Sequence, residues 1–208
     1  MTIDKDQIRM VIALVVVAVI AAGVTGLTDI FTRAPIAAAQ KKALHQALQQ
    51  VLPEHVNDPQ AEMINIDGTP VYPAKNTDGS VTGLAWEVVA PDGYSGSIRI
   101  LVGLRPDASI QAIRITYHRE TPGLGDGIIN NHPWLASFVG QTLDSKNWKV
   151  KKDGGDFDQF TGATITPRAV VKAVKSALEF FHSHHALMLE KATKVKQLPQ
   201  PNKESGNE

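Results

Sequence analysis

The sequence predicts an α+β chain with a single N-terminal transmembrane helix, followed by an antiparallel sheet with flanking helices. Three observations predict this. Residues 10–28 carry no charge, residues 81–117 contain runs of strand-forming residues separated by turns, and apolar residues recur at helical spacing after residue 166. Strands in sequence followed by a terminal amphipathic helix are typical of an α+β domain.

The uncharged segment from Met10 to Thr28 predicts a membrane anchor. A helix of this length spans about 28 Å, close to the roughly 30 Å hydrocarbon core of a bilayer. The alternative is a cleaved signal peptide, for which Ala37 and Ala39 offer a cleavage site. Because the apolar segment is longer than the usual apolar region of a signal peptide, we favour a retained anchor.

Basic residues near the span do not decide its orientation. Lys5 and Arg9 precede it, and Arg33, Lys41 and Lys42 follow it. The positive-inside count is therefore nearly balanced, and long C-terminal domains translocate largely regardless of such charges.

The chain is expected to divide at changes of composition. The expected parts are residues 1–9 at the cytoplasmic N-terminus, 10–28 as the anchor, 29–53 as a post-anchor helix, 54–190 as the main domain and 191–208 as a disordered polar tail. The second helix is predicted from Ala37 to Leu52 and ends before Pro53, which cannot continue helical hydrogen bonding. Residues 53–77 show no pattern that places an element.

A meander of three antiparallel strands is predicted at residues 81–89, 97–104 and 109–117. Turn signals separate them, around Pro91-Asp92-Gly93 and Pro106-Asp107. The third strand is apolar on both faces, which favours a central position in the sheet.

Shorter elements are expected to complete the domain. Residues 118–126 contain two glycines and a proline and predict a loop. A short helix is expected over 128–138, a strand from Trp148 and a turn over 151–156. The terminal helix is expected to have Thr166 as its N-cap and Pro167 at its first position.

Composition excludes several classes of function. The chain has 21 basic and 21 acidic residues, so nothing favours a nucleic-acid partner, and without cysteine it has no thiolate nucleophile or zinc–thiolate site. The sequence contains neither G-x-S-x-G nor H-E-x-x-H. We expect no metal site: the histidines after residue 181 are interpreted as a solvated helix end, and the aspartates of 153–158 lack the spacing of a calcium loop.

The most informative motif is Asp158-Gln-Phe-Thr-Gly-Ala-Thr164. Thr164 is expected just before a helix N-terminus, where unpaired N–H groups and the helix dipole favour a phosphate. Gly162 and Ala163 leave room for a ligand to approach. The alternative is a tight loop that only leads into a capped helix.

This motif resembles the D-x-x-[ST]-G-A-[ST] signature of proteins that carry FMN covalently on a threonine. The match covers Asp158, Thr161, Gly162, Ala163 and Thr164. The resemblance implies that Thr164 is esterified by the FMN phosphate and that a separate flavin transferase attaches it, with FAD as donor. Asp158 would serve transferase recognition or loop geometry, and Thr161 would stabilise the turn through a side-chain to backbone hydrogen bond.

A second motif, Glu120-Thr-Pro-Gly-Leu-Gly125, also resembles the FMN-binding domain family. The resemblance implies that His118, Glu120, Thr121 and Leu124 line the flavin or its approach. For His118 and Glu120, simple solvation in the loop is the alternative.

Together, the anchor, the strands and both motifs resemble the FMN-bearing G subunits of Rnf-type ion-translocating electron transport complexes. The C subunit of the sodium-pumping NADH:quinone reductase is a near relative. The resemblance implies a single-pass protein of the bacterial inner membrane with its C-terminal domain in the periplasm. It also implies electron relay by FMN among the other subunits of a complex, with membrane lipid around the anchor and no independent catalytic activity.

Two alternatives remain open at this point. The chain could be the FMN-binding module of another extracytoplasmic electron-transfer system, such as the sodium-pumping reductase. It could instead be a non-redox assembly subunit of the same fold, which would carry no flavin.

Overall fold

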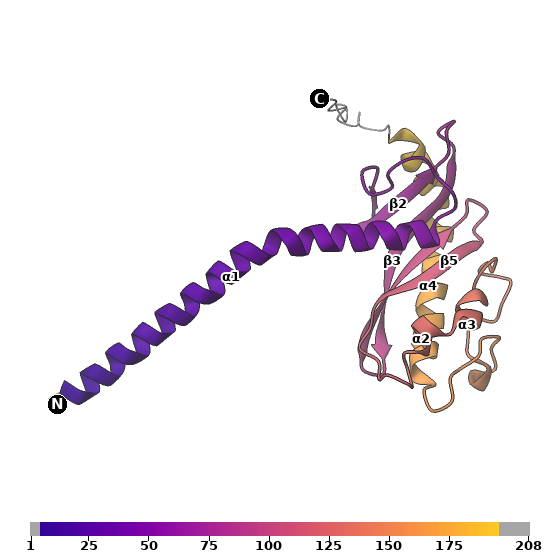
Figure 1. Cartoon of the computed structure of the whole chain (residues 1–208). Helices are drawn as coiled ribbons and strands as arrows, with labels where there is room; N and C mark the ends of the chain where they lie inside the picture. The colour runs from indigo at the N-terminus through magenta and orange to yellow at the C-terminus, as the bar shows by residue number, and fades with distance from the viewer. Residues whose placement is uncertain (1–4, 196–208) are drawn as a thin grey trace, which may run out of the picture. The chain divides into compact units, whose positions relative to one another are not determined.

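The computed structural model describes residues 5–195. The chain divides into two compact units between Leu44 and His45. The elements shown in Figure 1 are α1 (Lys5–Val51), β1 (Ile64–Ile66), β2 (Thr69–Lys75), β3 (Val81–Gly93), β4 (Gly96–Leu104), β5 (Ile110–Tyr117), α2 (Gly127–Asn130), α3 (His132–Ala136), the 3-10 helix η1 (Lys151–Asp153) and α4 (Ile165–Lys194).

Helix α1 is one continuous element where the sequence predicted two. It contains Pro35, which has no N–H to donate to the carbonyl four residues earlier. By length and composition the helix can cross a membrane, and none of its most apolar stretch is buried within the protein. The hydroxyls of Thr25, Thr28 and Thr32 donate to carbonyls four residues earlier, so these polar groups are satisfied inside the helix.

The predicted fold class is confirmed. The strands form one antiparallel sheet in the order β1-β2-β3-β4-β5, and its first two strands come from the segment that the sequence left unassigned. The predicted central position of 109–117 is wrong, because β5 is an edge strand. Strand β5 can be apolar at the edge of the sheet because α2 and α3 lie against it. The backbone also continues the pairing there, since the Gly140 N–H donates to the Ile110 carbonyl at 2.8 Å.

One face of the sheet packs on α4 and forms the main core. Alternate residues of β4 point to this face and are fully buried, namely Ile98, Ile100 and Val102. The Trp86 ring on β3 stacks on Phe181 of α4 with ring centroids 6.1 Å apart and an interplanar angle of 9°. This packing fixes the helix against the sheet. Figure 1 shows α4 lying along the sheet.

The opposite face is covered in part by the end of α1, from His45 onward. Val51 is fully buried there. The contact is close: a Cβ added to Gly103 would lie 1.9 Å from the Val51 carbonyl oxygen, and one added to Gly83 would lie 2.5 Å from the Pro53 ring. Only glycine at these two positions admits the chain so near the sheet.

Helix α4 differs from its prediction at both ends. It begins at Ile165 with Thr164 as N-cap, so the expected N-cap Thr166 lies inside the first turn, where its hydroxyl bonds to Glu120 instead. The helix continues through Lys194, so the prediction of a disordered tail is wrong for 191–194, and residues 196–208 lie outside the described residues.

Three smaller predictions are also corrected. His184 and His185 do not lie at a helix end; their rings pack on Phe180 and Phe181 inside α4. The predicted strand from Trp148 is reduced to an isolated bridge in the segment that follows it. The helix expected over 128–138 is divided into α2 and α3, since the Asn131 side chain caps α3 through the Trp134 N–H.

Candidate functional site

A cavity of about 220 Å³ lies where three separate segments meet. The segments are the turn between β3 and β4, the loop after β5 and the start of α4. The residues that line the cavity are Tyr94, Glu120, Thr121, Leu124, Gly125, Gly162, Ala163, Thr164, Ile165 and Thr166. The two sequence motifs, far apart along the chain, therefore lie side by side.

A tight turn shapes the wall of the cavity before α4. The Ala163 N–H donates to the Phe160 carbonyl at 3.1 Å, and Gly162 has a φ of 78°. A positive φ at the third residue of a turn is what a type II turn requires, which explains glycine at this position. A Cβ on Gly162 would lie 3.6 Å from a methyl group of Leu124, so the two motif loops are at van der Waals distance.

Thr164 occupies the N-cap position of α4 without using its hydroxyl as a cap. Its backbone is in the right-handed helical region, with φ −73° and ψ −31°, and the side chain makes no capping hydrogen bond. Its carbonyl accepts the first helical hydrogen bond, from the Arg168 N–H at 3.2 Å. Most N-cap threonines use the hydroxyl to satisfy the first turn. Here the hydroxyl remains available beside the cavity.

Glu120 connects all three segments of the cavity wall. Its side chain is buried, with only 4% of the residue exposed. One carboxylate oxygen accepts from the Ser95 N–H at 3.0 Å, and the other accepts from the buried Thr166 hydroxyl in a short hydrogen bond. A buried carboxylate needs such donors to offset its desolvation. Glu120 thus holds the β3–β4 turn and the start of α4 together.

Aromatic packing positions the loop before Thr164. The Phe160 ring lies against Gly127, where an added Cβ would come within 2.9 Å of it. Trp134 packs edge-on to Phe160 at 5.2 Å between centroids, and its indole N–H donates to the Asp158 carbonyl at 2.8 Å. The backbone from Asp158 to Phe160 is therefore fixed by α2 and α3.

Ion pairs flank the same loop at the surface. The Arg168 guanidinium binds both carboxylate oxygens of Asp153, at 2.6 and 2.8 Å. The hydrogen bond from Arg168 is the main reason that the pKa of the Asp153 carboxyl lies below its ordinary value. Lys151 pairs with Asp158 at 2.7 Å, and Asp158 is largely exposed.

Six of the residues predicted for the site line the cavity: Glu120, Thr121, Leu124, Gly162, Ala163 and Thr164. The other three predicted residues, His118, Asp158 and Thr161, lie outside the lining.

These three residues have other surroundings. The His118 ring accepts from the Glu120 N–H at 3.2 Å, and Asp158 points to Lys151. Thr161 is exposed, and within residues 5–195 its hydroxyl has no hydrogen-bond partner, so the expected side-chain bond across the turn is absent there.

Tyr94, Gly125, Ile165 and Thr166 also line the cavity, and the sequence analysis did not assign them to the site. Gly125 is the last residue of the second motif and Ile165 directly follows the first, so both could have been included on that ground. Tyr94 gave no signal, because its contribution depends on how the β3–β4 turn folds toward α4.

Comparison with known proteins gives matches to both the N-terminal helix and the folded domain. Residues 93–179 match the FMN-binding domain, and residues 1–51 match the RnfG N-terminal region. The G subunit of the ion-translocating oxidoreductase complex of Aliivibrio fischeri (strain MJ11) is 42% identical over 193 residues, covering 86% of this chain and 91% of the relative. The G subunit from Vibrio cholerae serotype O1 (strain M66-2) is 44% identical over 187 residues, covering 82% and 88%. Among solved structures, Shewanella oneidensis NqrC aligns with 21% identity and a TM-score of 0.48, covering 69% of this chain and 73% of that one.

Proposed function

Because the chain belongs to the RnfG family, the G subunits of ion-translocating oxidoreductase complexes, we propose that it carries FMN on Thr164 through a phosphoester and relays electrons within such a complex. The observation that carries the proposal is the Thr164 hydroxyl. It makes no capping hydrogen bond at the start of α4 and lies beside a cavity formed by both FMN-domain motifs.

The start of α4 suits a phosphate group. The first backbone N–H groups of a helix have no partner within the helix, and the dipole places partial positive charge there. Anions bind at such termini for both reasons. Gly162 and Ala163 add little side-chain bulk beside Thr164, so a phosphate on its hydroxyl has room near these N–H groups.

The rest of the cavity suits part of a flat aromatic ring system. Leu124, Ile165 and Tyr94 supply apolar surface, and all are substantially exposed, at 51%, 43% and 70%. A cavity of about 220 Å³ is smaller than the roughly 300–1,000 Å³ of sites that enclose a whole ligand. We therefore expect an FMN here to be bound on one side and accessible on the other, as electron exchange with a partner requires.

Attachment needs an external catalyst. A threonine hydroxyl is a poor nucleophile at neutral pH without a nearby base. The Glu120 carboxylate already accepts hydrogen bonds from Ser95 and Thr166, and Asp158 pairs with Lys151. An FAD-dependent flavin transferase would supply the base that removes the hydroxyl proton. The Thr164 Oγ–phosphorus bond would form as the pyrophosphate bond of FAD breaks and AMP leaves.

Bound FMN would supply the redox chemistry, and the chain would fix its position. Glu120 and the Phe160–Trp134 contact hold the loops that carry the site, so the flavin would be presented from rigid backbone. In this role the chain binds no small substrate and has no independent catalytic activity. Its partners would be the other subunits of the complex.

We propose that α1 anchors the chain in the bacterial inner membrane with the folded domain on the periplasmic side. The absence of cysteine allows a clean test. A single Ala186→Cys substitution on the exposed side of α4 should react in intact cells with a maleimide that cannot cross the inner membrane. Labelling only after cell lysis would place the domain in the cytoplasm instead.

The test of the flavin is intact mass after co-expression with a flavin transferase. The wild-type chain should gain the mass of FMN minus water, and its yellow colour should survive denaturation. Thr164→Ser should keep the modification, since it retains a hydroxyl, whereas Thr164→Ala should lose it. Thr161→Ala is the matched control, because Thr161 lies three residues away and outside the cavity lining.

Two outcomes would oppose the proposal. If the wild type stays unmodified beside an active transferase, the chain is an assembly subunit without a flavin. If Thr164→Ala is still modified, the attachment site is another residue. A flavin-loaded chain that co-purifies with sodium-pumping NADH:quinone reductase subunits would assign the module to that system.

A further inference from the structure

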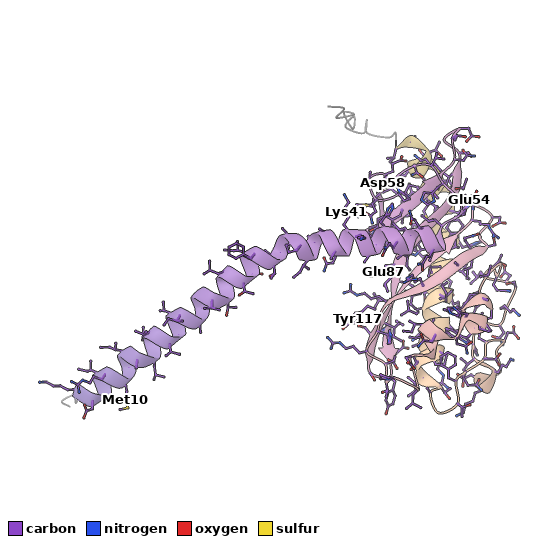
Figure 2. All side chains as sticks on the ribbon, viewed as in Figure 1. Met10, Lys41, Glu54, Asp58, Glu87 and Tyr117 are labelled. Atoms are coloured by element: carbon purple, nitrogen blue, oxygen red, sulfur yellow. The ribbon has the colours of Figure 1, made fainter. Side chains whose placement is uncertain are left out.

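Within residues 45–195, part of the sheet face opposite α4 is not covered by another element. There Val89, Arg99 and Tyr117 lie next to one another on β3, β4 and β5, paired in register as Val89–Arg99 and Arg99–Tyr117. Arg114 and Arg119 flank them. We call these five residues the arginine face. Figure 2 labels Tyr117 and Glu87; the Glu87 carboxylate accepts from the hydroxyl of Thr116, the residue before Tyr117.

Within the unit from His45 onward, the described residues cover only part of this side of the sheet. The pair Ala85–Gly103 lies under the last turn of α1, where Gly103 admits the Val51 carbonyl. Four residues away along the strands, the pair Val89–Arg99 has no such cover, and Val89 is 52% exposed. An antiparallel sheet can leave one face in water, and such faces normally carry alternating polar residues. The exposed Val89 and Tyr117, on either side of Arg99, depart from that pattern.

Two arginines of the arginine face, Arg99 and Arg119, are held against the Tyr117 ring. The Arg99 and Arg119 guanidinium groups lie 5.7 and 5.8 Å from the centre of the Tyr117 ring. Arg119 also donates a hydrogen bond to the Tyr117 hydroxyl. Cation–π contacts restrict the arginines without neutralising them. Little side-chain entropy would then be lost when the arginines bind a partner.

The charge of the region is strongly one-sided. Within residues 5–195, the only carboxylate at ion-pair distance from these arginines is Glu87, which is 3.8 Å from Arg99. One oxygen of Glu87 also accepts from the Thr116 hydroxyl at 2.9 Å. Three arginines against one glutamate leave an excess of positive charge. Arg114 and Arg119 are both exposed.

We propose that the arginine face is the docking surface for an acidic surface of another subunit of the complex. Arginine and tyrosine are enriched in protein interfaces, and the guanidinium fork matches carboxylates in two-bond geometry. Val89 and the Tyr117 ring supply apolar area on either side of Arg99, and the arginines supply the charge. A carboxylate-rich protein surface satisfies both features.

The test is site-specific photo-crosslinking in membranes that contain the whole complex. A benzoylphenylalanine at position 89 replaces an exposed valine and leaves the arginines intact. It should crosslink to another subunit through a peptide rich in Asp and Glu, identified by mass spectrometry. The double charge reversal Arg99→Glu with Arg114→Glu should lower the yield about tenfold or more, as expected when charge pairs at an interface are reversed.

Controls separate docking from folding and from the flavin. The same crosslinker at Lys175, on α4 and half-exposed, should not capture that peptide, and Lys175→Glu should leave the yield at position 89 unchanged. Circular dichroism of the full-length double variant checks that the domain stays folded. Thr164→Ala should also leave the crosslink in place, so failure of the flavin proposal would not affect this one.

Three results would overturn the proposal. The crosslinker at position 89 could give only phospholipid adducts, which would make the arginine face a membrane-binding surface. It could give no adduct in an intact complex. Finally, the crosslink could persist at full yield in the double charge reversal, which would show that the contact does not depend on the arginines. In the supporting case, replacing one acidic residue of the captured peptide by arginine should restore crosslinking to the double variant.

Discussion

Replacing Glu120 should loosen the cavity wall more than any other single change in the two motifs. The carboxylate holds the Ser95 N–H of the β3–β4 turn and the Thr166 hydroxyl of α4 at once. Glu120→Ala removes both bonds. Glu120→Gln is the matched variant, because its amide has the same shape and can accept from Ser95 while it donates to Thr166.

The magnitude follows from burial. Hydrogen bonds to a charged group contribute roughly 1.5–3 kcal/mol each. The bond to Thr166 lies between residues that are 4% and 1% exposed, so its loss leaves a buried hydroxyl unpaired. Ser95 is exposed, and water can replace its partner. We therefore expect Glu120→Ala to lower the free energy of unfolding by about 3 kcal/mol, and Glu120→Gln by about 1 kcal/mol.

Thermal unfolding of the full-length chain in detergent, followed by near-ultraviolet circular dichroism, measures the effect. For a domain of this size, 3 kcal/mol corresponds to a fall in Tm of roughly 6–12 °C. Thr166→Val completes a double-mutant cycle with Glu120→Ala, which removes the hydrogen bond that Glu120→Gln can keep. The pair should show a coupling energy of about 1 kcal/mol or more, since the two groups bond directly. The Glu120→Gln chain should still accept FMN on Thr164.

The reasoning fails if Glu120→Ala melts within about 1 °C of the wild type, or if the coupling energy is near zero. Either result would mean that the buried carboxylate does not hold the two segments together. A Glu120→Ala chain that is destabilised as expected and yet modified at the wild-type rate would be a separate finding. It would confine the role of Glu120 to stability.

Three further predictions test other contacts that hold the domain and the candidate site in place. Gly103→Ala should strongly destabilise the domain in a thermal melt, because its Cβ would lie 1.9 Å from the Val51 carbonyl oxygen; Gly26→Ala, with no atom within 4 Å of its Cβ, is the neutral control. Phe160→Ala should slow FMN attachment to Thr164 in a timed mass assay more than Phe160→Leu, since the ring packs on Trp134 and Gly127; equal rates would contradict this. Arg168→Gln should lower Tm at neutral pH. Because Arg168 depresses the pKa of Asp153 in the folded state, this contribution is present above the ordinary value of 3.8 and is lost as pH falls below it. The difference in Tm should therefore shrink toward pH 3, and a constant difference would mean that the pair is not its source.

Local patterns were sufficient to predict most of the fold. The strands at 81–89, 97–104 and 109–117 correspond to β3, β4 and β5, because turn residues and β-branched runs mark them directly. The sequence did not predict strands β1 and β2. Pro70 and Pro73 are unusual inside a strand, so the segment of β2 lacks the pattern of one. Pro73 lies beyond the residues of β2 that pair with β1, and Pro70 lies opposite Asn65 of β1, the edge strand. The central position predicted for β5 was wrong for a different reason. Its buried residues Ile113 and Ile115 share one core with α2 and α3, which periodicity cannot show.

The site was predictable where it depends on motif residues and not where it depends on contacts across the fold. Thr164 and Glu120 were assigned from their motifs, and the structure brings both to one cavity. The exact helix start was missed by two residues, because Thr166 resembles an N-cap in sequence. In the structure the Thr166 hydroxyl instead donates to the distant carboxylate of Glu120. Tyr94 was missed because only the folded β3–β4 turn brings it beside α4.

This exchange of roles between the two threonines bears on the proposed chemistry. A helix start needs one capping group, and Thr166 would be the natural choice from the sequence. With Thr166 bonded to Glu120, the helix begins earlier in the chain and Thr164 becomes the N-cap, with its side chain unbonded. Glu120 therefore does more than support the wall. It keeps Thr166 out of the capping role, so that the hydroxyl presented at the positive end of α4 is that of Thr164.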